Sequence, residues 1–320
     1  MPVPVPYPAT PADRDRWILD RRGPRAAVDS RRAQAAWVEP ERSETGEVVP
    51  VATVFLVNRE CTWRCLMCDL WRHTLEGSVA PGTLPEQLDH ALAPLPPARQ
   101  LKLYNSGSFF DPRAVPPADH PALAARGRRF ERVIVECHPA LANDAAVRFR
   151  DQLAQPLEVA MGLETAHPQV LEKLNKRMTL DHFARAAAFL RRHGIAVRAF
   201  ILVQPPFLTD PEEALHWAER SVAFAFDCGA TVASLIPARP GNGALDALAQ
   251  VGEFVPPSLA TLETALERGL GLRRGRVFAD LWDLETFARC PACLPARRDR
   301  LQRMNLSQAI EPAVACPCHE

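Results

Sequence analysis

Long apolar runs and an excess of charge of either sign are missing from this 320-residue sequence. No apolar segment approaches the roughly 18 uninterrupted residues that a helix needs to span a bilayer. The first ten residues are rich in proline and are followed by the charged run Asp13 to Arg16, so nothing there reads as a secretory signal peptide. We therefore expect a cytoplasmic protein without a membrane segment.

Lysine is scarce, and the charges balance. Lys102, Lys173 and Lys176 are the only lysines among 38 basic residues, which equal the 38 acidic residues in number. A chain without net charge has no strong field that attracts nucleic acid or an anionic membrane by bulk electrostatics. Any contact with RNA must therefore come from a local patch of the surface.

Hydrophobic residues make up 47% of the chain, enough for one large core and a short appendage. From Val51 onward, short β-branched runs alternate with longer segments of helical period, a pattern that favours βα units and a parallel sheet. We predict an α/β fold, a partial (β/α)6 TIM-like barrel with an N-terminal extension and a small cysteine-rich C-terminal appendage. The six expected strands are 51–57, 100–104, 132–137, 157–163, 196–203 and 231–236.

The predicted organisation has four parts. Residues 1–48 form a partly helical N-terminal extension, and residues 49–240 form the barrel. Residues 241–288 form a C-terminal α/β extension, and residues 289–320 form a cysteine-rich, metal-binding tail. Parallel strands place ligands at their carboxyl ends, so we expect the residues just after each strand to form the active site.

The nine cysteines cluster in the chain, which in a cytoplasmic protein points to metal binding and not to a disulfide framework. Cys61, Cys65 and Cys68 follow the first expected strand, with three and then two residues between them. Thiolates at this spacing can ligate three irons of one 4Fe-4S cluster and leave the fourth iron open to a small molecule. A zinc loop that borrows His73 as a fourth ligand is the alternative.

This Cys-x3-Cys-x2-Cys loop on a partial barrel resembles the radical S-adenosylmethionine (radical SAM) superfamily. The resemblance implies that one electron from the reduced cluster breaks the sulfur–C5' bond of S-adenosyl-L-methionine (SAM), which gives methionine and a 5'-deoxyadenosyl radical that abstracts a substrate hydrogen. It also implies an electron donor such as flavodoxin or ferredoxin. The family often has an aromatic residue before the third cysteine. Here Met67 stands there, and its polarizable side chain can pack on adenine.

A turn of small residues follows the second expected strand, where the family commonly has a Gly-Gly-Glu-Pro motif. Asn105, Ser106, Gly107 and Ser108 form this turn. Small residues let backbone carbonyls approach the ammonium group of the cofactor closely, although the same residues are also ordinary in turns. We predict that these four residues bind the cofactor.

Three further candidates for cofactor binding close the later strands. Glu136 ends the third strand, Glu164 the fourth and Gln204 the fifth. An acid at this position can hold a ribose hydroxyl or the ammonium group of the cofactor. The alternative for the two glutamates is an ion pair within the barrel with Arg198 or Lys102.

Residues 161–176, with the sequence Met-Gly-Leu-Glu-Thr-Ala-His-Pro-Gln-Val-Leu-Glu-Lys-Leu-Asn-Lys, narrow the resemblance. They look like the subgroup that contains the Elongator catalytic subunit, the tRNA methylthiotransferases and the radical SAM subunit of archaeosine synthase. The last is also similar in its Cys-Thr-Trp-Arg-Cys loop and its Tyr-Asn-Ser-Gly-Ser-Phe-Phe-Asp turn. The resemblance covers roughly residues 50–240. It implies a tRNA nucleobase or nucleoside as substrate, and a partner protein that prepares it.

The end of the chain carries two close pairs of cysteines, Cys290 with Cys293 and Cys316 with Cys318. Four thiolates can hold a structural zinc ion or an auxiliary iron–sulfur cluster. The Cys-x-Cys spacing of the second pair is not that of a standard zinc ribbon, and two pairs without a shared metal are the third alternative. Two other cysteines lack ligand spacing and are expected in the core: Cys137 and Cys228.

Arginines are a candidate surface for RNA phosphates. One group lies between the two cysteine pairs, and another lies near the amino terminus. Together they can form a local phosphate-binding patch, although such runs are also common on solvated faces. These residues are Arg21, Arg22, Arg31, Arg32, Arg297, Arg298, Arg300 and Arg303.

Three functions compete. The first is a radical SAM enzyme, a transferase or lyase, that modifies a tRNA nucleobase. The second is a radical SAM maturase of a peptide or protein, with an auxiliary cluster in the tail. The third is a noncatalytic adaptor that carries zinc. The sequence identifies no catalytic side chain of its own.

Overall fold

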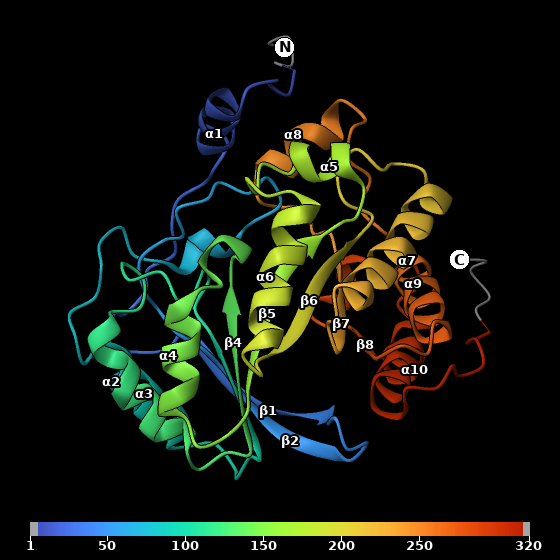
Figure 1. The fold of residues 1–320 in the computed structure, drawn as a ribbon. Helices are drawn as coiled ribbons and strands as arrows, with labels where there is room; N and C mark the ends of the chain where they lie inside the picture. Colours follow the sequence, from blue (N-terminus) through green and yellow to red (C-terminus); the bar gives the residue numbers. More distant parts are fainter. Residues whose placement is uncertain (1–5, 316–320) are drawn as a thin grey trace.

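A computed structural model describes residues 6–315 of the chain. In this part of the molecule, eight strands form one sheet in the order of the sequence (Figure 1). The first two strands pair antiparallel, and each later strand pairs parallel with the one before it. The strands are β1 (Ala35–Arg42), β2 (Val48–Phe55), β3 (Gln100–Tyr104), β4 (Arg132–Cys137), β5 (Leu157–Glu164), β6 (Ala196–Val203), β7 (Val232–Pro237) and β8 (Arg276–Ala279).

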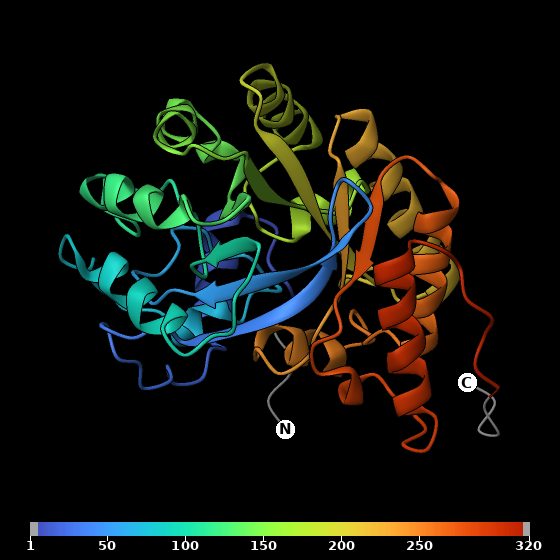
Figure 2. The ribbon, with the colours of Figure 1, turned by 90° about the horizontal axis from the view of Figure 1, so that it is seen from below.

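Helices line the outer side of the curved sheet (Figure 2). The main apolar core lies between the two layers, where α6, for example, buries Phe183, Ala187 and Leu190 on one face. No helix within residues 6–315 has both the length and the apolar character that a bilayer crossing requires. The α-helices are α1 (Pro11–Leu19), α2 (Thr83–Leu92), α3 (His120–Gly127), α4 (Asp144–Gln152), α5 (Pro168–Lys173), α6 (Leu180–Arg192), α7 (Pro211–Asp227), α8 (Ala244–Gln250), α9 (Leu259–Gly271) and α10 (Leu294–Ser307).

The predicted α/β fold, a partial TIM-like barrel, is confirmed by this parallel sheet and its outer helices. The sheet holds two strands more than the six predicted. β8 lies within residues 241–288 and pairs with β7. β1 lies within residues 1–48, where we expected a partly helical extension, and it pairs with β2. Its strand pattern is hard to recognise in the sequence because Glu39 and Glu41 alternate along the face that meets buried cations.

Those cations belong to a network of charges inside the barrel. Glu41 accepts hydrogen bonds from Arg198 at 2.6 Å and ion-pairs with Lys102 at 2.7 Å. Arg198 also donates to Glu158 of β5 at 2.7 Å. Burial opposes the ionisation of Glu41, but the charges of Arg198 and Lys102 hold its pKa well below the ordinary value. Strand β1 therefore completes the polar interior of the barrel.

The two edge strands of the sheet, β1 and β8, are linked to each other and to α10. Arg276 of β8 donates to the backbone oxygen of Arg42 at 2.9 Å, and Arg42 donates to the backbone oxygen of Leu306 in α10 at 3.0 Å. The rings of Trp37 and Trp282 lie 5.2 Å apart. The partial barrel is thus bridged at its opening by side chains of β1 and β8 and by the backbone of α10.

Candidate cofactor site

The loop of Cys61, Cys65 and Cys68 leaves the carboxyl end of β2, as the sequence predicts. Gln87 of α2 fixes its start, since its side chain accepts from the Val57 amide at 2.8 Å and donates to the Val57 carbonyl at 2.7 Å. Burial raises the pKa of the Cys61 and Cys65 thiols and raises that of Cys68 to about 12. Without a metal these thiols stay protonated at neutral pH.

The three thiols are not arranged as a closed metal cage. Over residues 6–315, no three cysteine, histidine or acidic side chains form a group that could hold a metal ion. This covers the three cysteines of the loop and the alternative zinc site with His73. The ligand set Cys61, Cys65 and Cys68 stays a prediction.

A turn that follows α5 holds the cysteine loop from one side. The Leu66 amide donates to the Leu174 carbonyl at 2.9 Å, and the Asn175 side chain donates to the Arg64 carbonyl at 2.8 Å. On the far side, Asn242 donates to the Leu66 carbonyl at 2.8 Å. Three hydrogen bonds therefore fix the backbone between the cysteines.

The loop also stacks against the residue that follows β4. The Trp63 indole lies flat on the His138 imidazole, with ring centroids 3.7 Å apart and planes inclined by 6°. His138 also contacts the turn after α5, since its Nε2 atom lies 2.9 Å from the Lys176 carbonyl oxygen. Burial lowers the pKa of His138 to about 3, so this imidazole is neutral.

The amino-terminal segment covers the outside of the loop. Glu60, next to Cys61, forms ion pairs with Arg22 at 2.7 Å, with Arg64 at 3.0 Å and with Arg25. The side chain of Glu60 is only 10% exposed. Residues ahead of β1 thus belong to the surroundings of the cysteine loop, which the sequence does not reveal.

The predicted turn after β3 lies directly against the cysteine loop. A Cβ atom built on Gly107 would lie 3.4 Å from Cβ of Cys61, at van der Waals distance, so the backbone of the turn passes close to the first cysteine. Asn58 donates to the Asn105 carbonyl at 2.8 Å, and Ser108 accepts from the His138 amide at 2.6 Å. The structure therefore brings the cysteine loop and the small-residue turn together.

Glu136 holds the backbone of that turn. Its carboxylate accepts hydrogen bonds from the amides of Asn105 and Gly107. Burial raises its pKa to about 6, partly offset by these amides. The alternative of an ion pair with Arg198 or Lys102 is wrong, because both cations are occupied by acids of β1 and β5.

Glu164 is buried at the end of β5, where a β-bulge after Gly162 turns its backbone to a φ of 66°. Its carboxylate pairs with Lys176 at 2.7 Å. Glu164 therefore forms an ion pair, as the alternative prediction has it. The predicted partners Arg198 and Lys102 are wrong, because the cation comes from the turn after α5 and not from the barrel strands. Nothing in the strand pattern identifies Lys176.

Gln204 and Met67 lie at the edge of this region. Gln204 has a φ of 53°, and its side chain donates to the Val255 carbonyl at 3.0 Å. Met67 is partly buried and packs between two small apolar groups, one around Trp17 and one around Leu174. Whether Met67 contacts adenine stays a prediction.

Strain and unpartnered polar atoms concentrate at this end of the sheet. Ser106 follows β3, Glu164 ends β5 and Gln204 follows β6, and all three adopt the left-handed region. Such backbone and buried polar atoms without partners each cost about 1–3 kcal/mol and gather where ligands bind. Within the described chain, five residues here have buried side-chain atoms without a hydrogen-bond partner: Asn58, Asn105, Ser106, Asn175 and Gln204.

These groups fit a polar ligand. The unpartnered atoms include both amide donors and carbonyl or hydroxyl acceptors. The methionyl and ribose parts of SAM carry ammonium, carboxylate and hydroxyl groups that complement such a set. The donor set and the three adjacent thiols are therefore compatible with a 4Fe-4S cluster and SAM.

Sequence comparison identifies relatives of this chain among known proteins. No protein-family model matches the sequence. The sequence is 25% identical to archaeosine synthase subunit beta of Methanosarcina acetivorans, over 84% of this chain and 82% of that protein. This chain resembles archaeosine synthase subunit beta. A shorter match, 28% identical, covers 34% of this chain and 36% of the subunit of the same name from Thermococcus kodakarensis.

The predicted resemblance to the archaeosine synthase subunit, and the prediction of an enzyme, are confirmed by these relatives. Among solved structures, methylornithine synthase is 13% identical, with a TM-score of 0.46 over 82% of this chain and 84% of that one. Coproporphyrinogen III oxidase of Escherichia coli is 13% identical, with a TM-score of 0.43 over 73% of this chain and 57% of that one. Both structural likenesses are weak.

The cysteine tail of this archaeosine synthase-like chain is described only in part. The sulfur atoms of Cys290 and Cys293 lie 3.4 Å apart at the start of α10. Cys316 and Cys318 lie outside the described residues. A zinc site or auxiliary cluster formed by the four cysteines stays a prediction.

The prediction of an RNA-binding arginine patch is wrong for Arg297, Arg300 and Arg22, which are buried or paired with acids. Arg297 and Arg300 are 4% and 2% exposed, and both pair with Glu263 of α9. Arg22 is likewise engaged by Glu60. The helical spacing of α10 turns these guanidinium groups inward, so they join α10 to α9 and do not reach RNA phosphates.

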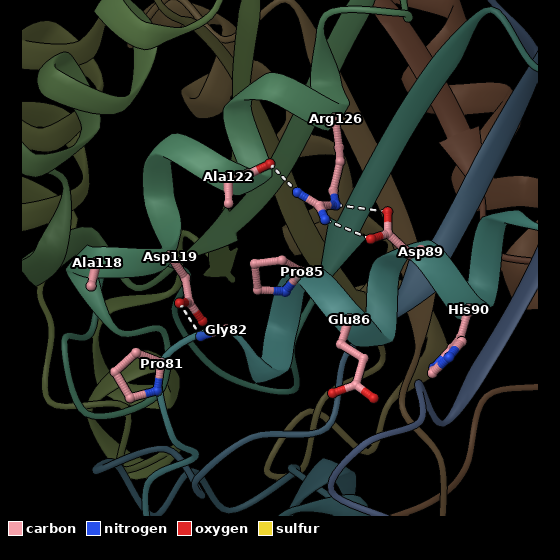
Figure 3. Close-up of a pocket in the computed structure, with 10 residues that line it drawn as sticks. All are labelled: Pro81, Gly82, Pro85, Glu86, Asp89, His90, Ala118, Asp119, Ala122 and Arg126. Atoms are coloured by element: carbon pink, nitrogen blue, oxygen red, sulfur yellow. Dashed lines mark hydrogen bonds and ion pairs between the residues drawn. The ribbon is translucent and has the colours of Figure 1, made fainter.

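A surface cavity lies away from the cysteine loop. It has a volume of about 630 Å³ and lies between α2 and α3, on the outer side of the sheet (Figure 3). Arg126 and Asp89 form an ion pair across it, and Asp119 accepts from the Gly82 amide. None of the residues that line this cavity belongs to the cysteine loop or to the turn after β3, so it is separate from the candidate site.

Proposed function

We propose that this protein is a radical SAM enzyme in which Cys61, Cys65 and Cys68 hold a 4Fe-4S cluster and the open iron binds SAM. One observation carries the proposal: the three-cysteine loop lies against a turn in which the buried side-chain polar atoms of Asn105 and Ser106 have no partners in the described chain. When bound, the cluster supplies the electron that breaks the sulfur–C5' bond of SAM. The protein contributes binding groups and a site shielded from water.

The residues around the loop then have separate roles. Gly107 places the backbone of the turn after β3 beside Cys61, and Glu136 keeps that turn in place through its backbone amides. The unpartnered atoms of Asn105 and Ser106 are available to the methionyl part of SAM. The side-chain carbonyl oxygen of Gln204, which has no partner, can accept a hydrogen bond from a ribose hydroxyl. We further propose that Ser108 contributes indirectly, by accepting the hydrogen bond from the His138 amide that fixes His138 in place. We also propose that Met67 packs on adenine.

We propose a tRNA nucleobase as the substrate. The support is the similarity to archaeosine synthase subunit beta, whose name also implies a partner subunit. Electrons would come from a donor such as flavodoxin or ferredoxin.

Aromatic side chains near the carboxyl ends of β2 and β8 agree with a planar substrate. Phe55 stacks on Trp37 at 5.4 Å and on Trp282 at 5.9 Å, both with planes inclined by 19°. The Trp282 side chain is about half exposed, at 50%. Unpaired bases of RNA stack on such rings. This observation favours a nucleobase over a peptide.

Mass analysis of tRNA tests the proposal. The reconstituted enzyme is incubated with bulk tRNA and SAM under anaerobic reducing conditions, and the nucleosides are compared with those from a Cys65→Ala variant. We expect a nucleoside mass change with the wild type and none with the variant. An unchanged nucleoside profile, or the same change in both samples, would contradict the assignment.

The maturase is a second candidate because the sulfurs of Cys290 and Cys293 lie close enough to share a metal. Metal analysis separates the two functions: one 4Fe-4S cluster with zinc favours the tRNA enzyme, and two clusters favour the maturase. A zinc adaptor would form no 5'-deoxyadenosine with SAM and reductant.

A further inference from the structure

One buried lysine faces the cysteine loop, and the proposed function gives it no task. Lys176 is 8% exposed and follows the two residues, Leu174 and Asn175, that hydrogen-bond to the loop between the cysteines. Its own carbonyl lies against His138, which stacks under Trp63. The backbone on both sides of Lys176 is therefore anchored to the cysteine loop.

The side chain is held as firmly as the backbone. Nζ of Lys176 pairs with Oε1 of Glu164 at 2.7 Å, and both side chains are at most 10% exposed. Gly162 makes room for this pair, since a Cβ atom at that position would overlap both charged groups. Asn175 adopts a φ of 57°, which turns the chain so that Lys176 points inward.

The charge of Lys176 acts on the cysteines. Lys176 is the cation whose electrostatic field acts on both Cys61 and Cys65. The acids that act in the opposite direction are Glu136 and Asp111 at Cys61 and Glu164 at Cys65. Burial opposes the charge of Lys176, but Glu164 keeps its pKa above the ordinary value, so the ammonium group stays charged.

We propose that Lys176 is a positioning residue that places one fixed positive charge beside the cluster and thereby raises its reduction potential, with Glu164 moderating the effect. The inference rests on the proposed function, because it assumes that Cys61, Cys65 and Cys68 hold a cluster. Reduction adds one negative charge to the cluster, and a buried cation nearby stabilises that charge more than the oxidised form. Net charge around a cluster is one of the main determinants of its potential.

Two substitutions must then shift the potential in opposite directions. Lys176→Met removes the cation and should lower the ratio of reduced to oxidised cluster at a fixed applied potential about tenfold, which is about 59 mV for a one-electron couple. Glu164→Gln leaves the cation without its counter-charge and should raise the ratio. If the Lys176–Glu164 pair had only a structural role, there would be no reason for the two substitutions to shift the reduction potential in opposite directions.

The experiment is a redox titration of the full-length, reconstituted chain without SAM, followed by electron paramagnetic resonance. Lys176→Arg should restore the potential of the wild type, because it keeps the charge. Lys102→Met is the matched control: it also removes a buried, ion-paired lysine, but one that pairs with Glu39 and Glu41 inside the barrel. We expect it to cost stability and to leave the potential unchanged.

The outcomes separate this inference from the proposed function. Iron analysis precedes the titration, and a wild-type chain without a cluster overturns both. A full cluster whose potential is the same in Lys176→Met, Glu164→Gln and wild type overturns the inference alone. If Lys176→Met does not fold, Glu164→Gln still decides: a higher potential supports the role of Lys176, and an unchanged or lower one contradicts it.

Discussion

At the scale of single residues, small and buried side chains decide whether the candidate site can assemble. Gly162 is the clearest case, because the space that its missing side chain leaves is filled by the Glu164–Lys176 pair. The sequence predicts Glu164 from its place at a strand end. It cannot predict the pair, since the bulge that reorients Glu164 and the turn that delivers Lys176 are tertiary features.

Gly162→Ala should separate this ion pair. The added methyl group overlaps both charged groups, and a buried pair that loses its geometry leaves desolvated charges behind. We expect a loss of about 2–4 kcal/mol in the free energy of unfolding, measured by chemical denaturation. Gly271→Ala is the control, because a Cβ atom there meets no atom within 4 Å and α9 accepts alanine. Equal stability of the two variants would contradict this account.

Glu136 should impose a pH dependence on stability. Its pKa in the folded protein is about 6, above the ordinary 4.5, so the folded state binds more protons between these values. The stability contributed by the protonated carboxyl is therefore fully present below pH 4.5 and is lost as the pH rises through 6. Relative to Glu136→Gln, the wild type should lose on the order of 2 kcal/mol between pH 4 and pH 7. Parallel pH profiles of the two proteins would show that burial does not affect this group.

At the scale of elements, the sequence predicts the parallel strands well because their apolar runs are continuous and lie between helical segments. It misses β1, whose inward face is charged, and it separates β8 from the barrel because the strand is only 4 residues long. The contacts that fix the cysteine loop come from three distant segments. No local pattern contains them.

The turn after α5 should control how firmly the loop retains metal. Asn175→Ala removes the hydrogen bond to the Arg64 carbonyl and places alanine in the left-handed region. We expect less iron per chain after desalting of the reconstituted protein. Asn143→Ala, which removes the cap of α4, should cost about 1 kcal/mol and keep the iron of the wild type. Iron retention by Asn175→Ala equal to that of this control would show that the turn does not hold the loop.

At the scale of the whole molecule, buried ion pairs join parts that the sequence treats separately. Glu41 of the predicted extension pairs with Arg198 of the barrel, and Arg300 of the predicted tail pairs with Glu263 of α9. The arginines of α10 illustrate the limit of a charge pattern. It reports where charge occurs along the chain, whereas the acids of another element decide whether that charge faces solvent.

Glu41→Gln should destabilise the entire barrel. It leaves Arg198 and Lys102 buried with one carboxylate fewer, which typically costs about 3–5 kcal/mol. We expect a single, earlier unfolding transition in thermal denaturation. Glu47→Gln, which breaks an exposed pair with Arg99, should change stability by less than about 1 kcal/mol. A loss no larger than that of the control would mean that β1 is not part of the cooperative fold.

The central claim is that one set of thiolates holds the cluster, and iron analysis tests it most directly. Anaerobically reconstituted wild type should carry about four irons per chain in this site. Changing Cys61, Cys65 and Cys68 together to alanine should remove them, whereas changing Cys137 and Cys228, which lack ligand spacing, should not. Full iron content in the triple variant, or none in the wild type, would contradict the account.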